Sequence, residues 1–208
     1  MLYITFMEIS KYYSPNYNKK TRSSKSITAI ILHYTGMQSE RESIKRLTNH
    51  KSKVSCHYLI NRRGMIIKLV NERYVAWHAG KSMWKNYKNL NENSLGIELV
   101  NKGHKYGYQS FTKKQITKLV RLCKKLKKKY KIKNNLILGH SDISPLRKID
   151  PGEKFPWGYL SSKGIGIYPK KNLNISIGKK IVEKKKFIKN LWKIGYRYLN
   201  VGDKKKII

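Results

Sequence analysis

Apolar runs of strand length recur along the first two thirds of the chain. They occupy residues 27–34, 54–61, 65–70, 94–100 and 136–139. The run 27–34 is almost continuously apolar and rich in β-branched residues, which is typical of a strand covered on both faces in an α/β structure. Arg62-Arg63-Gly64 separates the second run from the third. Glycine can adopt a positive φ in such a turn, so these two runs predict a β-hairpin.

Two segments between the strands have helical patterns. Each opens with a hydroxyl residue followed three positions later by Glu or Gln, the capping-box pattern: Ser39 with Glu42, and Thr112 with Gln115. The second helix has an apolar stripe at helical spacing, formed by Ile116, Leu119, Cys123, Leu126 and Tyr130. Its opposite face is basic, because residues 113–131 contain ten Lys or Arg and no acidic residue.

Composition divides the chain into three parts. Residues 1–26 are predicted to be an irregular lead-in, because residues 8–26 are polar and turn-rich, and residues 27–168 contain the strands and helices of one predicted domain. Within that domain, residues 71–93 have no periodic pattern and are expected to be irregular. The tail, residues 169–208, is strongly basic and predicts one short amphipathic helix. The apolar face of that helix consists of Ile181, Ile188, Leu191 and Trp192, and Gly195 would end it.

The charge of the chain is its most unusual bulk property. Its 208 residues include 47 Lys and Arg against 11 Asp and Glu, a formal net charge of +36. Such a field attracts polyanions, which predicts non-specific contact with nucleic acid or anionic envelope polymers. The charge is spread along the chain and forms no basic stripe interleaved with aromatic residues, so a solvated basic surface is the simpler interpretation. A specific nucleic-acid site is not expected.

Other bulk features exclude further classes. Two cysteines, Cys56 and Cys123, provide no disulfide framework, and no apolar run approaches the ~20 residues that cross a bilayer. The short apolar run at 2–7 has neither a basic leader nor a cleavage site beside it. Read literally, the sequence predicts a cytoplasmic protein; a periplasmic or envelope-associated location is the alternative if the true start lies elsewhere. The oligomeric state stays open.

Candidate metal ligands follow two of the predicted strands. His140 stands where the strand 136–139 ends, and His33 lies near the end of the first strand. Ten residues after His140, Asp150 precedes a proline, which favours an extended backbone that places Lys148 and Asp150 on the same side. Two His and one Asp are the number and type of ligands in a catalytic zinc site. Because no spacing rule links His33 to His140, each can equally be an ordinary buried or surface histidine.

Glu98 is the strongest single candidate for acid–base chemistry. It lies inside the apolar run 94–100, and burying a carboxylate there is costly unless a partner or a function holds it. The alternative is a solvent-facing glutamate at a sheet edge. Gly96 shares its face of the strand and is expected to leave room for a substrate.

Five segments together make the sequence recognisable. They are His33-Tyr34-Thr35, Val54-Ser55-Cys56-His57-Tyr58, Ala76-Trp77-His78-Ala79-Gly80, Gly96-Ile97-Glu98 and the segment 139–152. In this order they resemble the type 2 N-acetylmuramoyl-L-alanine amidases, zinc hydrolases related to phage amidase-lysozymes and peptidoglycan recognition proteins. The resemblance extends from about residue 14 to residue 168.

The resemblance implies a fold, a metal site and a reaction. It implies a mixed central β-sheet flanked by helices, with one zinc ion held by His33, His140 and Asp150. Glu98 and Lys148 match the catalytic pair of the family. The implied reaction is hydrolysis of the amide bond between N-acetylmuramic acid and L-alanine, in peptidoglycan or its muropeptide fragments. Glu98 would act as general base and Lys148 would stabilise the oxyanion.

Other matching positions have less defined roles. Trp77 and His78 resemble residues that line the substrate groove of the family, although packing within their loop explains them equally well. His57 is expected to be structural, and His50 and His104 to be solvated. Cys56 stands where some relatives have a catalytic Tyr. In the tail, the segment 191–196 faintly resembles the opening of a peptidoglycan-binding module, of which the chain would contain only a part.

Two alternative functions remain. Some relatives bind muropeptides without cleaving them, and loss of a zinc ligand would favour that reading, but all three ligand types are present in this sequence. A nucleic-acid binder is the third reading; it predicts DNA binding that depends steeply on salt.

Overall fold

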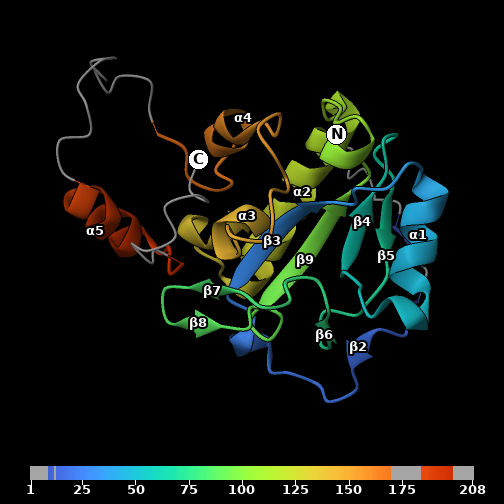
Figure 1. Cartoon of the computed structure of the whole chain (residues 1–208). Coiled ribbons are helices and arrows are strands. Elements are labelled where there is room, and N and C mark those ends of the chain that lie inside the picture. The colour runs from blue at the N-terminus through green and yellow to red at the C-terminus, as the bar shows by residue number, and fades with distance from the viewer. Residues whose placement is uncertain (1–8, 12, 170–183, 199–208) are drawn as a thin grey trace, which may run out of the picture.

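The centre of the fold is a six-stranded mixed β-sheet (Figure 1). The computed structural model describes residues 9–11, 13–169 and 184–198. In spatial order the strands are β1 (Ile9–Lys11), β5 (Ile66–Lys68), β4 (Tyr58–Ile60), β9 (Ser94–Leu99), β3 (Ala29–Tyr34) and β10 (Ile137–Gly139). Only β4 and β5 pair antiparallel, and the other neighbours are parallel. The expected mixed sheet is therefore confirmed.

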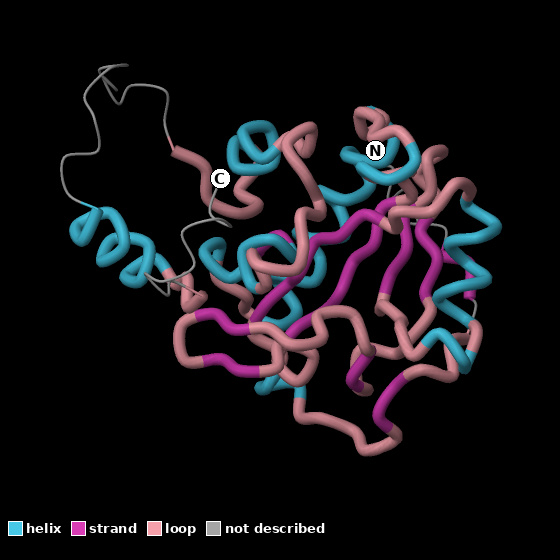
Figure 2. Tube along the Cα trace, viewed as in Figure 1, coloured by secondary structure: helices cyan, strands magenta, loops and turns pink. Residues whose placement is uncertain are grey.

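Helices cover both faces of this sheet (Figure 2). The helix α2 (Lys113–Tyr130) and the short α4 (Trp157–Ser162) pack against one face, and α1 (Glu40–Thr48) and α3 (His140–Ile143) lie on the other. Successive side chains of a strand point to opposite faces. Ile30 and Leu32 of β3 accordingly pack with α2, whereas Ile31 packs on the α3 face. His33, two residues after Ile31, shares that face.

Both predicted helices begin where their capping residues indicate, at Ser39 and Thr112. The Thr112 hydroxyl accepts a hydrogen bond from the Gln115 amide and the Gln115 side chain accepts one from the Thr112 amide, both at 3.1 Å, so the predicted capping box of α2 is confirmed. At α1 only half of the box forms. The Ser39 hydroxyl accepts from the Glu42 amide, but the Glu42 carboxylate accepts from the amide of Gln38 instead of Ser39.

The predicted hairpin is present, with Gly64 at φ 85° in its turn. Segments expected to be irregular contain short strands. In the lead-in, β1 pairs with β5, and β2 (Tyr17–Asn18) pairs with β6 (Val75–Ala76). Within 71–93, β7 (Met83–Trp84) and β8 (Tyr87–Lys88) form a second small hairpin. The described residues also contain four single-turn 3-10 helices: Ser24–Ser26, His50–Ser52, His104–Tyr106 and Asn134–Leu136.

The tail contains the expected helix. It is α5 (Lys184–Ile194), in which the Leu191 carbonyl accepts bonds from the Gly195 and Tyr196 amides. Ile181, assigned to the apolar face of this helix, lies outside the described residues. Phe187 and Trp192 of α5 are exposed. Among the helices that the structure describes, none is both long and apolar enough to cross a membrane.

Candidate metal centre and catalytic pocket

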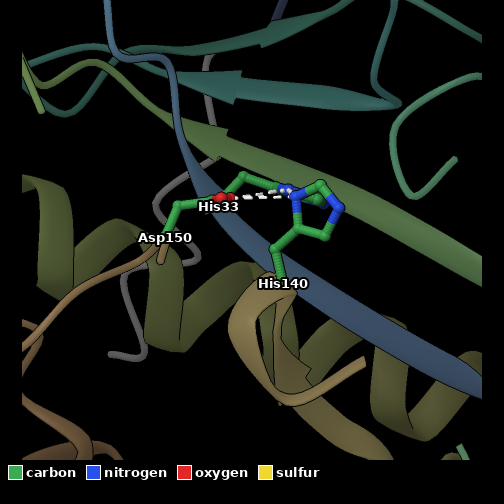
Figure 3. Close-up of side chains that lie close together, drawn as sticks. All are labelled: His33, His140 and Asp150. Carbon is green, nitrogen blue, oxygen red and sulfur yellow. Dashed lines mark hydrogen bonds and ion pairs between the residues drawn. The ribbon is translucent and has the colours of Figure 1, made fainter. Parts of the chain in front are cut away.

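Neighbouring parallel strands bring the two candidate histidines together. In the β3–β10 ladder Gly139 pairs with Leu32, so the next residues, His140 and His33, stand side by side, with His33 still inside β3 and His140 at the start of α3. Asp150 reaches them from the loop after α3. All three side chains are buried, and Figure 3 shows them pointing toward one another.

The ligand atoms of these three residues form a nearly equilateral triangle. His33 Nδ1 lies 3.0 Å from His140 Nδ1 and 3.0 Å from Asp150 Oδ2, and the latter two atoms are 3.1 Å apart. A tetrahedral zinc ion with ligand distances of 2.0–2.1 Å places its ligands ~3.3 Å from one another. The residues present therefore fit a metal ion with three protein ligands, which leaves one coordination position for water.

Hydrogen bonds on the far side of each imidazole orient these ligands. His140 Nε2 donates to the Ala79 carbonyl at 3.0 Å, so Nε2 carries a proton and Nδ1 is turned toward the site. His33 Nε2 lies 3.1 Å from His78 Nδ1. Burial, and then the nearby His140, lowers the pKa of His33 to about 4, which keeps that ring neutral at physiological pH.

Glu98 lies beside this triangle, and among the described residues one oxygen of its carboxylate has no hydrogen-bond partner. It pairs in register with His33 on the adjacent parallel strand, and within the described part of the chain its buried Oε2 has no hydrogen-bond partner. Burial, and then the charge of Asp150, raises the pKa of Glu98 to about 8. Lys148 and Arg46 act in the opposite direction. A half-buried carboxyl with one enclosed, unpaired oxygen and a raised pKa, beside a candidate metal site, is typical of a catalytic acid–base group.

A pocket of about 450 Å³ opens over the triangle. All seven candidate residues of the sequence analysis line it: His33, Trp77, His78, Glu98, His140, Lys148 and Asp150. Lys148 and Asp150 thus share one site, as their spacing predicts. Trp77 is half-buried, and its indole Nε1 donates to Asn18 Oδ1 at 2.8 Å, which holds the ring at the pocket wall.

Gly96 differs from its expected role, and His78 is the reason. A Cβ on Gly96 would lie 2.4 Å from His78 Cγ, so the space over Gly96 is filled by His78 and is not left for a substrate. The imidazole of His78 is buried between His33 Nε2 and the Ser94 hydroxyl, 3.4 Å from His78 Nε2. Its Nδ1 contacts His33 Nε2 at 3.1 Å, and His78 also lines the pocket.

Two residues of the site have no signal in the sequence. His104, expected to be solvated, bonds the Tyr34 hydroxyl at 2.8 Å and Glu153 at 2.9 Å, and lines the pocket. Arg147 donates to the Ala79 carbonyl at 2.8 Å, the same oxygen that orients His140. Both roles depend on loops that meet only in the folded chain.

Comparison with known families identifies the chain. The N-acetylmuramoyl-L-alanine amidase family matches residues 23–153, which include every candidate site residue named above. The chain belongs to this amidase family. The resemblance seen in the sequence is thereby confirmed.

Individual amidases extend the match. The chain is 39% identical over 156 residues to the N-acetylmuramoyl-L-alanine amidase AmiD of Escherichia coli K12, covering 69% of this chain and 55% of that protein. It is 34% identical over 168 residues to the 1,6-anhydro-N-acetylmuramyl-L-alanine amidase AmpD of Haemophilus influenzae, covering 72% and 89% of the two chains. The chain thus spans about half the length of AmiD and most of AmpD.

Solved amidase structures share the fold. The E. coli AmiD structure, in complex with anhydro-N-acetylmuramic acid-L-Ala-D-γ-Glu-L-Lys, superposes with a TM-score of 0.75 at 32% identity, over 86% of this chain and 76% of that one. AmpDh3 from Pseudomonas aeruginosa, in complex with anhydromuramic pentapeptide, superposes with a TM-score of 0.74 at 29% identity, over 88% and 79%.

Proposed function

We propose that this chain is a zinc-dependent N-acetylmuramoyl-L-alanine amidase. Its substrate is the amide between N-acetylmuramic acid and L-alanine in peptidoglycan or its turnover fragments. The observation that carries the proposal is the triangle of His33 Nδ1, His140 Nδ1 and Asp150 Oδ2 with the unpaired carboxyl of Glu98 beside it. The names and bound ligands of the related amidases support the choice of substrate.

His33, His140 and Asp150 would hold one zinc ion. When bound, zinc lowers the pKa of a coordinated water to about 7 and polarises a carbonyl oxygen. Glu98 accepts the proton of the attacking water at its free Oε2 and returns a proton to the departing alanine nitrogen. The ammonium of Lys148 stands near the carbonyl oxygen, where negative charge develops. The raised pKa of Glu98 suits both proton transfers, because a carboxyl with such a pKa takes up and releases a proton near neutral pH.

The rest of the pocket binds the substrate. Trp77 offers an aromatic ring held at the wall by Asn18, a surface that suits the face of a sugar. The basic side chains of Arg46, Lys105 and Lys148 line the same pocket and suit the carboxylates of a stem peptide. His78 contributes to binding mainly through the position of His33, since its ring is buried behind that ligand.

The charge of the chain adds a non-specific contact. The net charge of +36 and the exposed basic face of α2 favour weak attraction to anionic polymers. The partial peptidoglycan-binding module in the tail and the cytoplasmic location both stay predictions.

The proposal is tested by mass spectrometry of defined muropeptides incubated with the protein, with and without a chelator. We expect release of the intact peptide with a free L-alanine amine, abolished by the chelator and restored by Zn²⁺. Binding of muropeptides that is insensitive to the chelator and yields no product would instead identify a non-catalytic binding domain.

A further inference from the structure

The C-terminal segment reaches the turn that carries a metal ligand. Tyr196, two residues after the end of α5, donates its hydroxyl proton to Asp142 Oδ1 at 2.6 Å. The other oxygen of the same carboxylate, Oδ2, accepts from the Gly139 amide at 2.8 Å. Gly139 and Asp142 flank His140, so one carboxylate connects the tail to the backbone on both sides of this ligand.

The tail is docked at this point by more than one contact. The Lys85 amide donates to the Gly195 carbonyl at 2.8 Å, and the rings of Trp84 and Tyr196 meet edge to face with centroids 4.9 Å apart. Gly195 has φ 152°, and a Cβ there would lie 2.3 Å from the Trp84 indole. Only glycine permits this approach. Figure 1 shows the end of α5 beside β7, which contains Trp84.

The layer under Tyr196 also supports His140 from its other side. Trp84 packs in one apolar cluster with Ala79 and Ile143, and Tyr196 packs against that cluster. The Ala79 carbonyl accepts the Nε2–H of His140, and Ile143 belongs to the same helical turn as His140. The contacts of the tail therefore converge on the elements that fix the orientation of this one imidazole.

The exposure of α5 indicates that the C-terminal segment does more than add packing to the domain. Its large apolar side chains Phe187, Trp192 and Ile194 are all exposed, between 44% and 57%. The helix thus buries little against the domain, whereas Tyr196, in the segment after it, is partly buried and its hydroxyl bonds the partly buried carboxylate of Asp142. A hydrogen bond from a hydroxyl to a carboxylate is charge-assisted and directional, so it favours one geometry.

We propose that Tyr196 is a positioning residue of the metal centre: through Asp142 it fixes the turn that presents His140, so the C-terminal segment is part of the metal-binding apparatus. The inference rests on the proposed zinc site. Residues that orient a metal ligand through hydrogen bonds typically contribute 10–100-fold to metal affinity. Tyr196 acts through one further residue, so we expect an effect of about tenfold.

The test compares the zinc affinity of full-length Tyr196→Phe, Asp142→Asn and the double variant by competition with a chromophoric chelator. Tyr196→Phe keeps the ring against Trp84 and removes only the hydroxyl. Tyr159→Phe is the matched control, because Tyr159 is an exposed tyrosine on α4 whose ring contacts Lys163. We expect the Kd for Zn²⁺ to rise about tenfold in Tyr196→Phe and more in Asp142→Asn, with no change in the control.

The double variant separates positioning from packing. If Tyr196 acts through Asp142, adding Tyr196→Phe to Asp142→Asn changes the zinc Kd little further, whereas independent effects would multiply. The visible spectrum of the Co²⁺-loaded protein gives a second readout, and we expect its bands to shift in Tyr196→Phe and in Asp142→Asn but not in the Tyr159→Phe control. Urea unfolding of each metal-free variant reports any loss of stability separately.

Failure of this inference and failure of the proposed function give different results. A Tyr196→Phe variant with lower stability but the zinc Kd and Co²⁺ spectrum of the wild type would overturn the inference and leave the proposed function intact. A wild-type chain that binds no zinc would overturn the proposed function together with it.

Discussion

Gly96→Ala tests how closely the metal centre depends on the packing behind it. The added Cβ would lie 2.4, 2.6 and 2.7 Å from three atoms of the His78 ring. To regain an ordinary carbon–carbon contact of about 3.5 Å, the ring has to move by about 1 Å. His78 is buried, and the same ring is held 3.1 Å from His33 Nε2. The movement therefore strains the strand or breaks the contact that orients a metal ligand.

The expected cost follows from that geometry. Forcing an extra methyl into a filled core site destabilises a protein by about 1–3 kcal/mol. Displacing the partner of a ligating histidine lowers metal affinity about tenfold or more. We expect Gly96→Ala to show both effects, in urea unfolding of the metal-free protein and in chelator competition for Zn²⁺.

Gly158→Ala is the matched control. This glycine lies in the helix α4, and a Cβ there would meet Tyr168 at 3.6 Å, an ordinary contact. An alanine in a helix is more favourable than glycine by about 0.5–1 kcal/mol, so this variant should be as stable as the wild type or more so. If Gly96→Ala matched the wild type in both stability and zinc affinity, the assigned packing of His78 behind His33 would be wrong.

Three further predictions concern single side chains. Glu98→Gln should keep one equivalent of zinc but lower turnover of a defined muropeptide about 10²–10⁴-fold, and unchanged turnover would remove Glu98 as the general base. Asp150→Ala should lose tight zinc binding by chelator competition, and retention of one equivalent would contradict its role as a ligand. Burial of Glu72 alone would raise its pKa, but hydrogen bonds from Lys129, Tyr130 and Tyr58 lower it to about 2. Its stabilisation is therefore present above pH 4.5 and lost as the pH falls toward 2. Allowing for solvent screening at Lys129, this is worth about 2 kcal/mol. Urea unfolding of Glu72→Gln should show that difference in full at pH 7 and less than half of it at pH 3, and an equal difference at both pH values would refute it.

Much of the fold could be predicted from local pattern. The run 27–34 and the stripe of α2 are long enough for their periodicity to outweigh local alternatives, and the capping box at Thr112 fixes where that helix begins. Strands of two or three residues, such as β2 and β7, have no such pattern. They form because a partner strand supplies their hydrogen bonds, and the local sequence does not show that partner. For this reason the lead-in and residues 71–93 were expected to be irregular.

The site was less predictable from local pattern than the fold, because its residues are far apart in the sequence. His33 and His140 are 107 residues apart, and only the register of β3 with β10 joins them, so the resemblance to a family identified them where spacing could not. The space over Gly96 is filled by His78, which comes from a different loop. The sequence of the strand that contains Gly96 does not reveal this contact. The same holds for Tyr196 and Asp142, 54 residues apart.

The central claim is that three distant side chains bind one metal ion beside Glu98. Anomalous scattering at the zinc edge, from crystals grown with Zn²⁺, tests it most directly. We predict a single strong peak within bonding distance of His33 Nδ1, His140 Nδ1 and Asp150 Oδ2, with the Glu98 carboxyl facing the remaining coordination position. A well-ordered pocket with no peak between those atoms, or zinc bound only elsewhere on the chain, would contradict the account.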